Sequence, residues 1–232
     1  MKRNGKKYVE ASKKIEKNKL YSLEEAIKLV KETSITKFDS SIEIAIKTNI
    51  DPKKNDHNLR GSLVLPNGTG KTKKILVITK GSNQESASKA GADYVGDTDM
   101  IEKIEKENWF DFDVIVATPD MMPALGKIGK VLGPRGLMPN PKTGTVTTNV
   151  VGTINDIKKG MIEYKNDTFG NIHSVIGKVS FDYKKIIENV IYFVNTIAKM
   201  KPNSLKGNLI DKISLSSTMG PGIKLDINSF DI

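Results

Sequence analysis

Several residue types are absent or scarce in this chain of 232 residues, and each absence narrows the class of protein. Cysteine is absent, which excludes disulfide-stapled secreted folds, thiolate nucleophiles and Cys-based zinc sites, and fits a reducing cytoplasm. No apolar run approaches the roughly 20 residues that a membrane-spanning helix needs. The basic first residues lack the apolar stretch of a signal peptide and, with their glutamates, are unlike a transit peptide. We therefore expect a cytoplasmic protein without a membrane partner.

Negative charge is also in deficit, and the positive excess is unevenly spread. The formal net charge is +10, from 37 basic and 27 acidic side chains. Residues 1–20 carry eight basic against two acidic side chains and residues 127–160 carry six against one, whereas residues 69–126 are acidic. Two basic patches favour contact with a polyanion, because each neutralised phosphate releases counterions. The alternative is a lysine-rich solvated surface, since only three of the basic residues are arginine.

Two patterns of predicted secondary structure follow one another along the chain: one at its two ends and another in its middle. A capping box at Ser22–Glu25 begins a short helix, and isoleucines then alternate with charged residues at 41–47 as on a half-exposed strand. From residue 69 to 160, buried strands alternate with helices, which is typical of a parallel sheet. Antiparallel strands return from residue 161, with a long helix at about 184–200. We predict an α/β and α+β protein with two domains: a discontinuous α+β domain from residues 1–68 and 161–232, and an inserted α/β domain from residues 69–160.

Signals for catalysis are sparse. Gly68–Thr72 ends like a phosphate-binding P-loop, but Leu65 stands where the first glycine belongs, and a strand follows instead of the required helix. His57 and His173 lack the pattern of a nucleophile and its base, and no His-rich spacing suggests a metal site. We expect no enzyme, no cofactor and no metal. An α/β nucleotide-binding enzyme is the alternative, supported by the Gly-Lys string alone.

Other residues suit RNA. Single-stranded and bulged RNA is recognised by stacking, by hydrogen bonds to base edges and through the 2′-hydroxyl. A run of hydroxyls at residues 214–218 leads into Met219 and Gly220, where a glycine allows close backbone approach. Phe38, Ser41 and Glu43 offer a ring, a hydroxyl and an acceptor. A strand edge and a loop without a ligand, or a general nucleic-acid binder, are the alternatives.

Longer strings carry a resemblance to a known family. They are KFDSSIEIAIKTNIDPKKNDHNLRGSLVLPNGTGK, AGADYVG, WFDFDVIVATPDMMPALGKIGKVLGPRGLMPNPKTGTV, KNDTFGNIHSVIGKVSF and STMGP. Along essentially its whole length the sequence resembles the bacterial-type large-subunit ribosomal protein one (L-one) family. The resemblance implies that the inserted domain is Rossmann-like. It also implies a cytoplasmic protein of the large ribosomal subunit, monomeric when free, that binds the mobile 23S rRNA stalk and helps to release deacylated tRNA from the exit site. A second implied role is translational repression by binding its own operon mRNA.

The resemblance also implies a set of RNA contacts, transferred motif by motif. Ser41 stands where relatives usually have threonine, which keeps the hydroxyl and loses a methyl group. The implied RNA-binding residues are Lys37, Phe38, Ser41, Glu43, Lys165, Asp167, His173, Ser214, Ser216, Thr218, Met219 and Gly220. The glycine- and proline-rich loop at 126–144 offers secondary phosphate contacts at Lys127, Lys130, Arg135 and Lys142.

Overall fold

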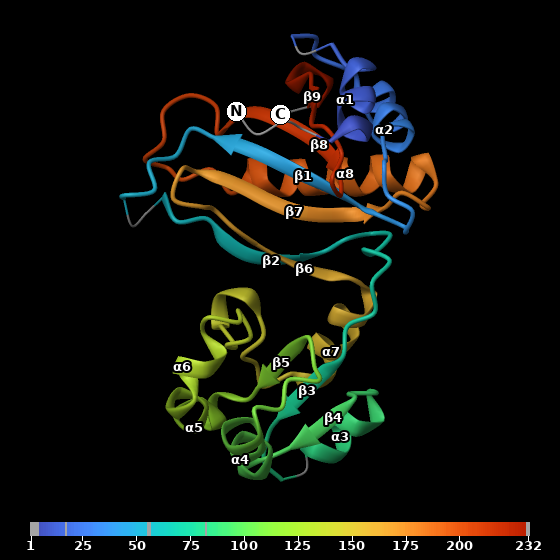
Figure 1. The fold of residues 1–232 in the computed structure, drawn as a ribbon. Helices are drawn as coiled ribbons and strands as arrows, with labels where there is room; N and C mark the ends of the chain where they lie inside the picture. Colours follow the sequence, from blue (N-terminus) through green and yellow to red (C-terminus); the bar gives the residue numbers. More distant parts are fainter. Residues whose placement is uncertain (1–4, 17, 55–56, 82, 231–232) are drawn as a thin grey trace. The chain divides into compact units, whose positions relative to one another are not determined.

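The computed structural model describes residues 5–16, 18–54, 57–81 and 83–230 (Figure 1). Within it the chain divides into two compact units. Unit 1 combines residues 1–70 with 162–232, and unit 2 consists of residues 71–161. The helices and strands mix as predicted for an α/β and α+β fold. That each unit folds by itself as a domain stays a prediction.

Unit 1 is built on a four-stranded sheet in the order β7-β1-β8-β9, in which all neighbours are antiparallel. Helices α2 and α8 pack against it, and α8 runs along one face (Figure 1). A two-stranded sheet of β2 and β6 completes the strands of this unit. The elements of unit 1 are α1 (Lys6–Lys13), α2 (Leu23–Glu32), β1 (Ser41–Thr48), β2 (Arg60–Val64), β6 (Met161–Lys165), β7 (Asn171–Lys178), α8 (Tyr183–Lys199), β8 (Ile210–Ser217), β9 (Ile223–Leu225) and the 3-10 helix η4 (Ile227–Ser229).

The alternating pattern of β1 decides which face of this sheet is buried. Ile42, Ile44 and Ile46 are fully buried in the unit 1 core, which α2 and α8 cover. Because side chains alternate across a strand, the intervening residues lie on the opposite face. The predicted cap of α2 is confirmed, since the Ser22 hydroxyl accepts a hydrogen bond from the Glu25 nitrogen at 3.4 Å.

Unit 2 holds a three-stranded parallel sheet in the order β4-β3-β5. All four residues of β3 are buried, as expected for a parallel strand covered on both faces. Helices α3 and α7 pack together, as do α4 and α5. The elements of unit 2 are β3 (Ile75–Ile78), α3 (Asn83–Lys89), β4 (Tyr94–Gly96), α4 (Thr98–Glu107), β5 (Val114–Ala117), η2 (Pro119–Met121), α5 (Met122–Lys127), α6 (Gly129–Leu132), η3 (Pro141–Thr143) and α7 (Val150–Lys159).

Two segments are more helical than the sequence predicts. The basic segment 1–20, expected as an arm, contains the helix α1 over Lys6–Lys13; residues 1–4 and 17 of this segment lie outside the described residues. The segment 126–144, expected as a loop, contains α6 and η3. Leu132 in α6 is fully buried in the unit 2 core, so a tertiary contact stabilises a helix that glycine-rich sequence disfavours.

Candidate nucleic-acid interface

The face of the four-stranded sheet opposite α2 and α8 is polar, and we call it the outer face. Its side chains are half-buried or exposed. In place of a second hydrophobic layer it carries hydroxyls, lysines, a histidine and a carboxylate. The outer face consists of Ser41, Glu43, Ala45 and Lys47 of β1, Asn171, His173 and Val175 of β7, Lys212, Ser214 and Ser216 of β8, and Lys224 of β9.

The strand register brings residues that are far apart in sequence into rows across the outer face. Glu43 lies opposite Ser216 of β8. Ala45 lies between His173 of β7 and Ser214 of β8, so a small side chain separates an imidazole from a hydroxyl. Directly opposed residues have Cβ atoms about 4.5–5.5 Å apart. Five of the predicted RNA contacts, including Ser41, therefore share one surface.

The segment that carries Lys37 and Phe38 is held at the start of β1. The Asp39 carboxylate accepts hydrogen bonds from the Ser180 nitrogen at 3.1 Å and from the Ser180 hydroxyl at 2.8 Å. The Lys178 ammonium donates to the Asp39 carbonyl oxygen and to the Ser41 hydroxyl, both at 3.3 Å. These contacts fix the backbone that directly follows Phe38, which is 63% exposed.

The turn after β8 lies at the same end of the sheet. The Thr218 hydroxyl accepts a hydrogen bond from the Ser41 nitrogen at 3.1 Å, so it is already used within the protein. Met219 has a left-handed backbone with φ of 64° and is 73% exposed. The left-handed residue of this turn is Met219 and not the neighbouring Gly220. A Cβ at Gly220 would instead collide with the Ser217 hydroxyl inside the turn.

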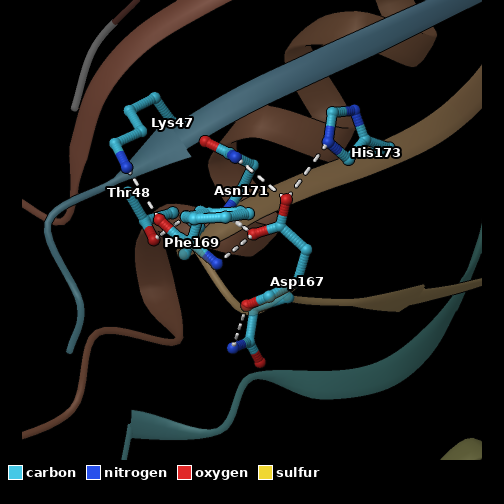
Figure 2. A network of polar contacts seen from close by, with 8 residues as sticks. Lys47, Thr48, Asp167, Phe169, Asn171 and His173 are labelled. Carbon is cyan, nitrogen blue, oxygen red and sulfur yellow. Dashed lines mark hydrogen bonds and ion pairs between the residues drawn. The ribbon is translucent and has the colours of Figure 1, made fainter. Parts of the chain in front are cut away.

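At the other end of β7, Asp167 organises the turn between β6 and β7 (Figure 2). Its carboxylate accepts hydrogen bonds from the backbone nitrogens of Phe169 at 2.8 Å and Asn171 at 2.7 Å, and from the Asn171 amide at 2.9 Å. His173 Nε2 lies 3.8 Å from Asp167 Oδ2. The bonds from Asn171, with smaller contributions from Phe169 and His173, lower the pKa of Asp167 to about 2. Asp167 is thus an ionised, fixed acceptor beside an exposed imidazole.

On unit 1 the predicted contacts therefore gather in three places: the outer face, the end where Phe38 and Met219 lie, and the Asp167 turn. Lys165 is exposed on β6, next to the Asp167 turn and outside the four-stranded sheet.

The four secondary phosphate contacts lie in unit 2 and are all exposed. Arg135 stacks on the ring of Phe110, with the guanidinium carbon 3.7 Å from the ring centroid. Four residues near the three places on unit 1 were not predicted as RNA contacts: Lys47, Lys212, Lys224 and Phe169. Alternation with Glu43 and Ser214 marks Lys47 and Lys212 as outward-facing, and strand pairing places Lys224 opposite Ser214.

The residues weighed for catalysis have structural roles. His57 is buried, where Nδ1 accepts from the Asp51 nitrogen at 3.0 Å and Nε2 lies 2.9 Å from the Ser204 hydroxyl. After Gly70 the chain runs without a helix into β3, so the backbone amides that a P-loop presents are not assembled there. Among the described residues, no cluster of three or more His, Asp or Glu side chains could hold a metal ion. None of the helices formed by these residues combines the length and apolar character needed to cross a bilayer.

Comparison with known proteins decides the family. The model of the ribosomal protein L1p/L10e family matches residues 30–221. The chain belongs to this family. It is 58% identical to "Large ribosomal subunit protein uL1" of Mesoplasma florum over 214 residues, which is 92% of this chain and 94% of that protein. It is 54% identical to the protein of the same name from Macrococcus caseolyticus over 226 residues, 97% of each chain.

Family membership confirms the resemblance seen in the sequence. The chain is a ribosomal protein that binds RNA and takes part in translation, and it is not an enzyme. The nucleotide-binding alternative is set aside on the same ground.

Proposed function

We propose that this protein is a component of the large ribosomal subunit that works on the cytoplasmic ribosome and binds the mobile 23S rRNA stalk through the outer face and the turns at its two ends. The observation that supports this most is the register of β7, β1 and β8. It places His173, Ser214, Glu43 and Ser216 on one exposed surface, although these residues come from three distant segments. Both relatives carry the name of a large-subunit protein.

The outer face has the chemistry that structured RNA requires. Hydroxyls of Ser214 and Ser216 donate to and accept from sugars and base edges, and the Glu43 carboxylate accepts from a 2′-hydroxyl or an exocyclic amine. Lysines of the same face supply phosphate contacts, which carry affinity without reading sequence. Phe38 and Met219 present apolar surface at one end, where a base can stack or pack.

We also propose that the bound stalk, moving with this protein, assists release of deacylated tRNA from the exit site. The basic segment 127–142 of unit 2 would then contribute phosphate contacts through Lys127, Lys130, Arg135 and Lys142. Stacking of Arg135 on Phe110 restrains the guanidinium and lowers the entropy lost when it binds a phosphate. Repression of the protein's own operon follows if its mRNA folds into an element that the same outer face binds.

Capture of RNA on the purified full chain, followed by sequencing, tests these roles together. We expect enrichment of a stalk segment of 23S rRNA and of one mRNA leader, with each RNA displacing the other. Equal recovery of duplex DNA and unrelated RNA would instead indicate a general polyanion binder. Recovery of the stalk without any mRNA would leave the ribosomal role in place and remove the repressor role.

A further inference from the structure

Phe169 has a large apolar side chain that is mostly exposed to solvent. It is 74% exposed, followed by Met219 at 73% and Phe38 at 63%, and these are the three highest values for large hydrophobic side chains among the described residues. The other two belong to the RNA contacts proposed above. A single exposed apolar residue needs no explanation. Here, however, all three of these exposed side chains lie at the ends of the outer face, and that arrangement needs an explanation.

The turn that carries Phe169 is held from both sides (Figure 2). The Phe169 nitrogen donates to Asp167 Oδ1 at 2.8 Å, and its carbonyl oxygen accepts from Lys47 Nζ at 2.7 Å. The next carbonyl, that of Gly170, accepts from the Thr48 nitrogen at 3.0 Å. The backbone is thus fixed to β1 while the ring stays in solvent. A preorganised aromatic surface loses little entropy on binding.

The surroundings of Phe169 are those of a nucleic-acid contact. Lys47 and His173 lie beside the turn on the outer face. A surface hollow next to it is lined in part by Lys165 and Asn166.

Phe38 and Phe169 lie at opposite ends of β1, so the length of the strand separates them. Phe38 lies shortly before Ser41, the first residue of β1, and the turn that carries Phe169 is bonded to the last two residues of β1, Lys47 and Thr48. Eight residues of strand span roughly 23 Å. At about 3.4 Å per stacked base this corresponds to several nucleotides, so one base cannot contact both rings.

We propose that Phe169 is a stacking platform for a second unpaired base of the bound RNA, at the end of β1 opposite Phe38. The inference rests on the proposed function, because it uses the same outer face. In this proposal the ring of Phe169 contacts the RNA directly. Asp167 and Lys47 position the ring through their hydrogen bonds to the Phe169 backbone.

The test uses the full chain and a 23S rRNA stalk fragment, with affinity measured over a series of salt concentrations. Phe169→Leu keeps an apolar side chain and removes the flat ring, so we expect affinity to fall by about fivefold to a hundredfold. The slope of log affinity against log salt should stay that of the parent, because no charge changes. Phe169→Trp should bind at least as tightly as the parent, with tryptophan fluorescence quenched by the RNA. Tyr192→Leu, at an exposed aromatic of α8, is the matched control and should bind like the parent.

Failure of this inference is distinguishable from failure of the proposed function. If Phe38→Leu weakens binding while Phe169→Leu and the parent bind equally, the second platform is overturned and the RNA-binding face stands. If Phe169→Trp shows no quenching in the complex, the ring does not stack. If the parent does not bind the stalk fragment, both proposals fall.

Discussion

The Thr218 hydroxyl lies 3.1 Å from the backbone nitrogen of Ser41, and the Thr218 nitrogen lies 3.0 Å from the Ser41 carbonyl oxygen. These two residues are 177 positions apart in sequence. Their hydrogen bonds join the turn after β8 to the start of β1. These hydrogen bonds hold the turn that carries Met219 against the strand that follows Phe38. The exposed side chains of Met219 and Phe38 therefore belong to one rigid end of the outer face.

Thr218→Val should therefore act on stability as well as on RNA binding. The valine cannot accept from the Ser41 nitrogen, and we expect the free energy of unfolding to fall by about 1 kcal/mol. Affinity for the stalk fragment should fall by about tenfold, which corresponds to about 1.4 kcal/mol. Urea unfolding and a binding titration measure the two effects. Thr218→Ser keeps the hydroxyl and should resemble the parent in both; a valine variant that also does so would show that the hydrogen bond is dispensable.

Met219→Gly should change stability and binding in opposite directions. A left-handed φ of 64° strains any residue with a Cβ, and glycine removes that strain. We expect the free energy of unfolding to rise by up to about 1 kcal/mol while affinity for the stalk RNA falls, because the exposed methionine is lost. Met219→Asn, which also tolerates this conformation, is the control for backbone relief. Unchanged affinity in the glycine variant would argue against an RNA contact by the Met219 side chain.

Gly220→Ala should weaken the folded protein even without RNA. The added methyl group would collide with the hydroxyl of Ser217, which is buried, and would lie 3.2 Å from the Ser217 carbonyl oxygen. Thermal unfolding of the free protein should detect the loss. The double variant Ser217→Ala/Gly220→Ala removes the hydroxyl and should recover part of the stability. If the single variant unfolds like the parent, the turn accommodates the methyl group and the predicted collision with Ser217 is wrong.

Part of the architecture was readable from local sequence, and part was not. The alternation of Ile42, Ile44 and Ile46 predicted which face of β1 is buried, and Ser22 predicted where α2 begins. Both signals act within a few residues. The hydrogen-bond partner of Thr218 depends on strands paired across more than a hundred residues, which no local pattern encodes. Phe169 was missed because an apolar residue in a turn gives no sign of its exposure.

Asp167→Asn should alter the pH dependence of stability. The Asp167 carboxyl has a pKa of about 2 in the folded protein and about 3.9 in an unfolded chain. The folded state favours the ionised form, so this contribution is present above about pH 4 and is lost as the pH falls toward 2. Urea unfolding at neutral pH should show the asparagine variant to be less stable, and the difference from the parent should shrink between pH 4 and pH 2. A difference that stays constant over that range would contradict the assigned pKa.

Hydrogen exchange of the full chain, with and without the 23S rRNA stalk fragment, tests the RNA-binding face most directly. The turns at its ends carry backbone amides that exchange more readily than those of the paired strands. We predict that RNA slows exchange at residues 36–40, 167–170 and 218–220 and leaves the exposed side of α8 unchanged. Slowed exchange confined to α8 or to unit 2, with these three turns unaffected, would contradict the placement of the RNA on the outer face.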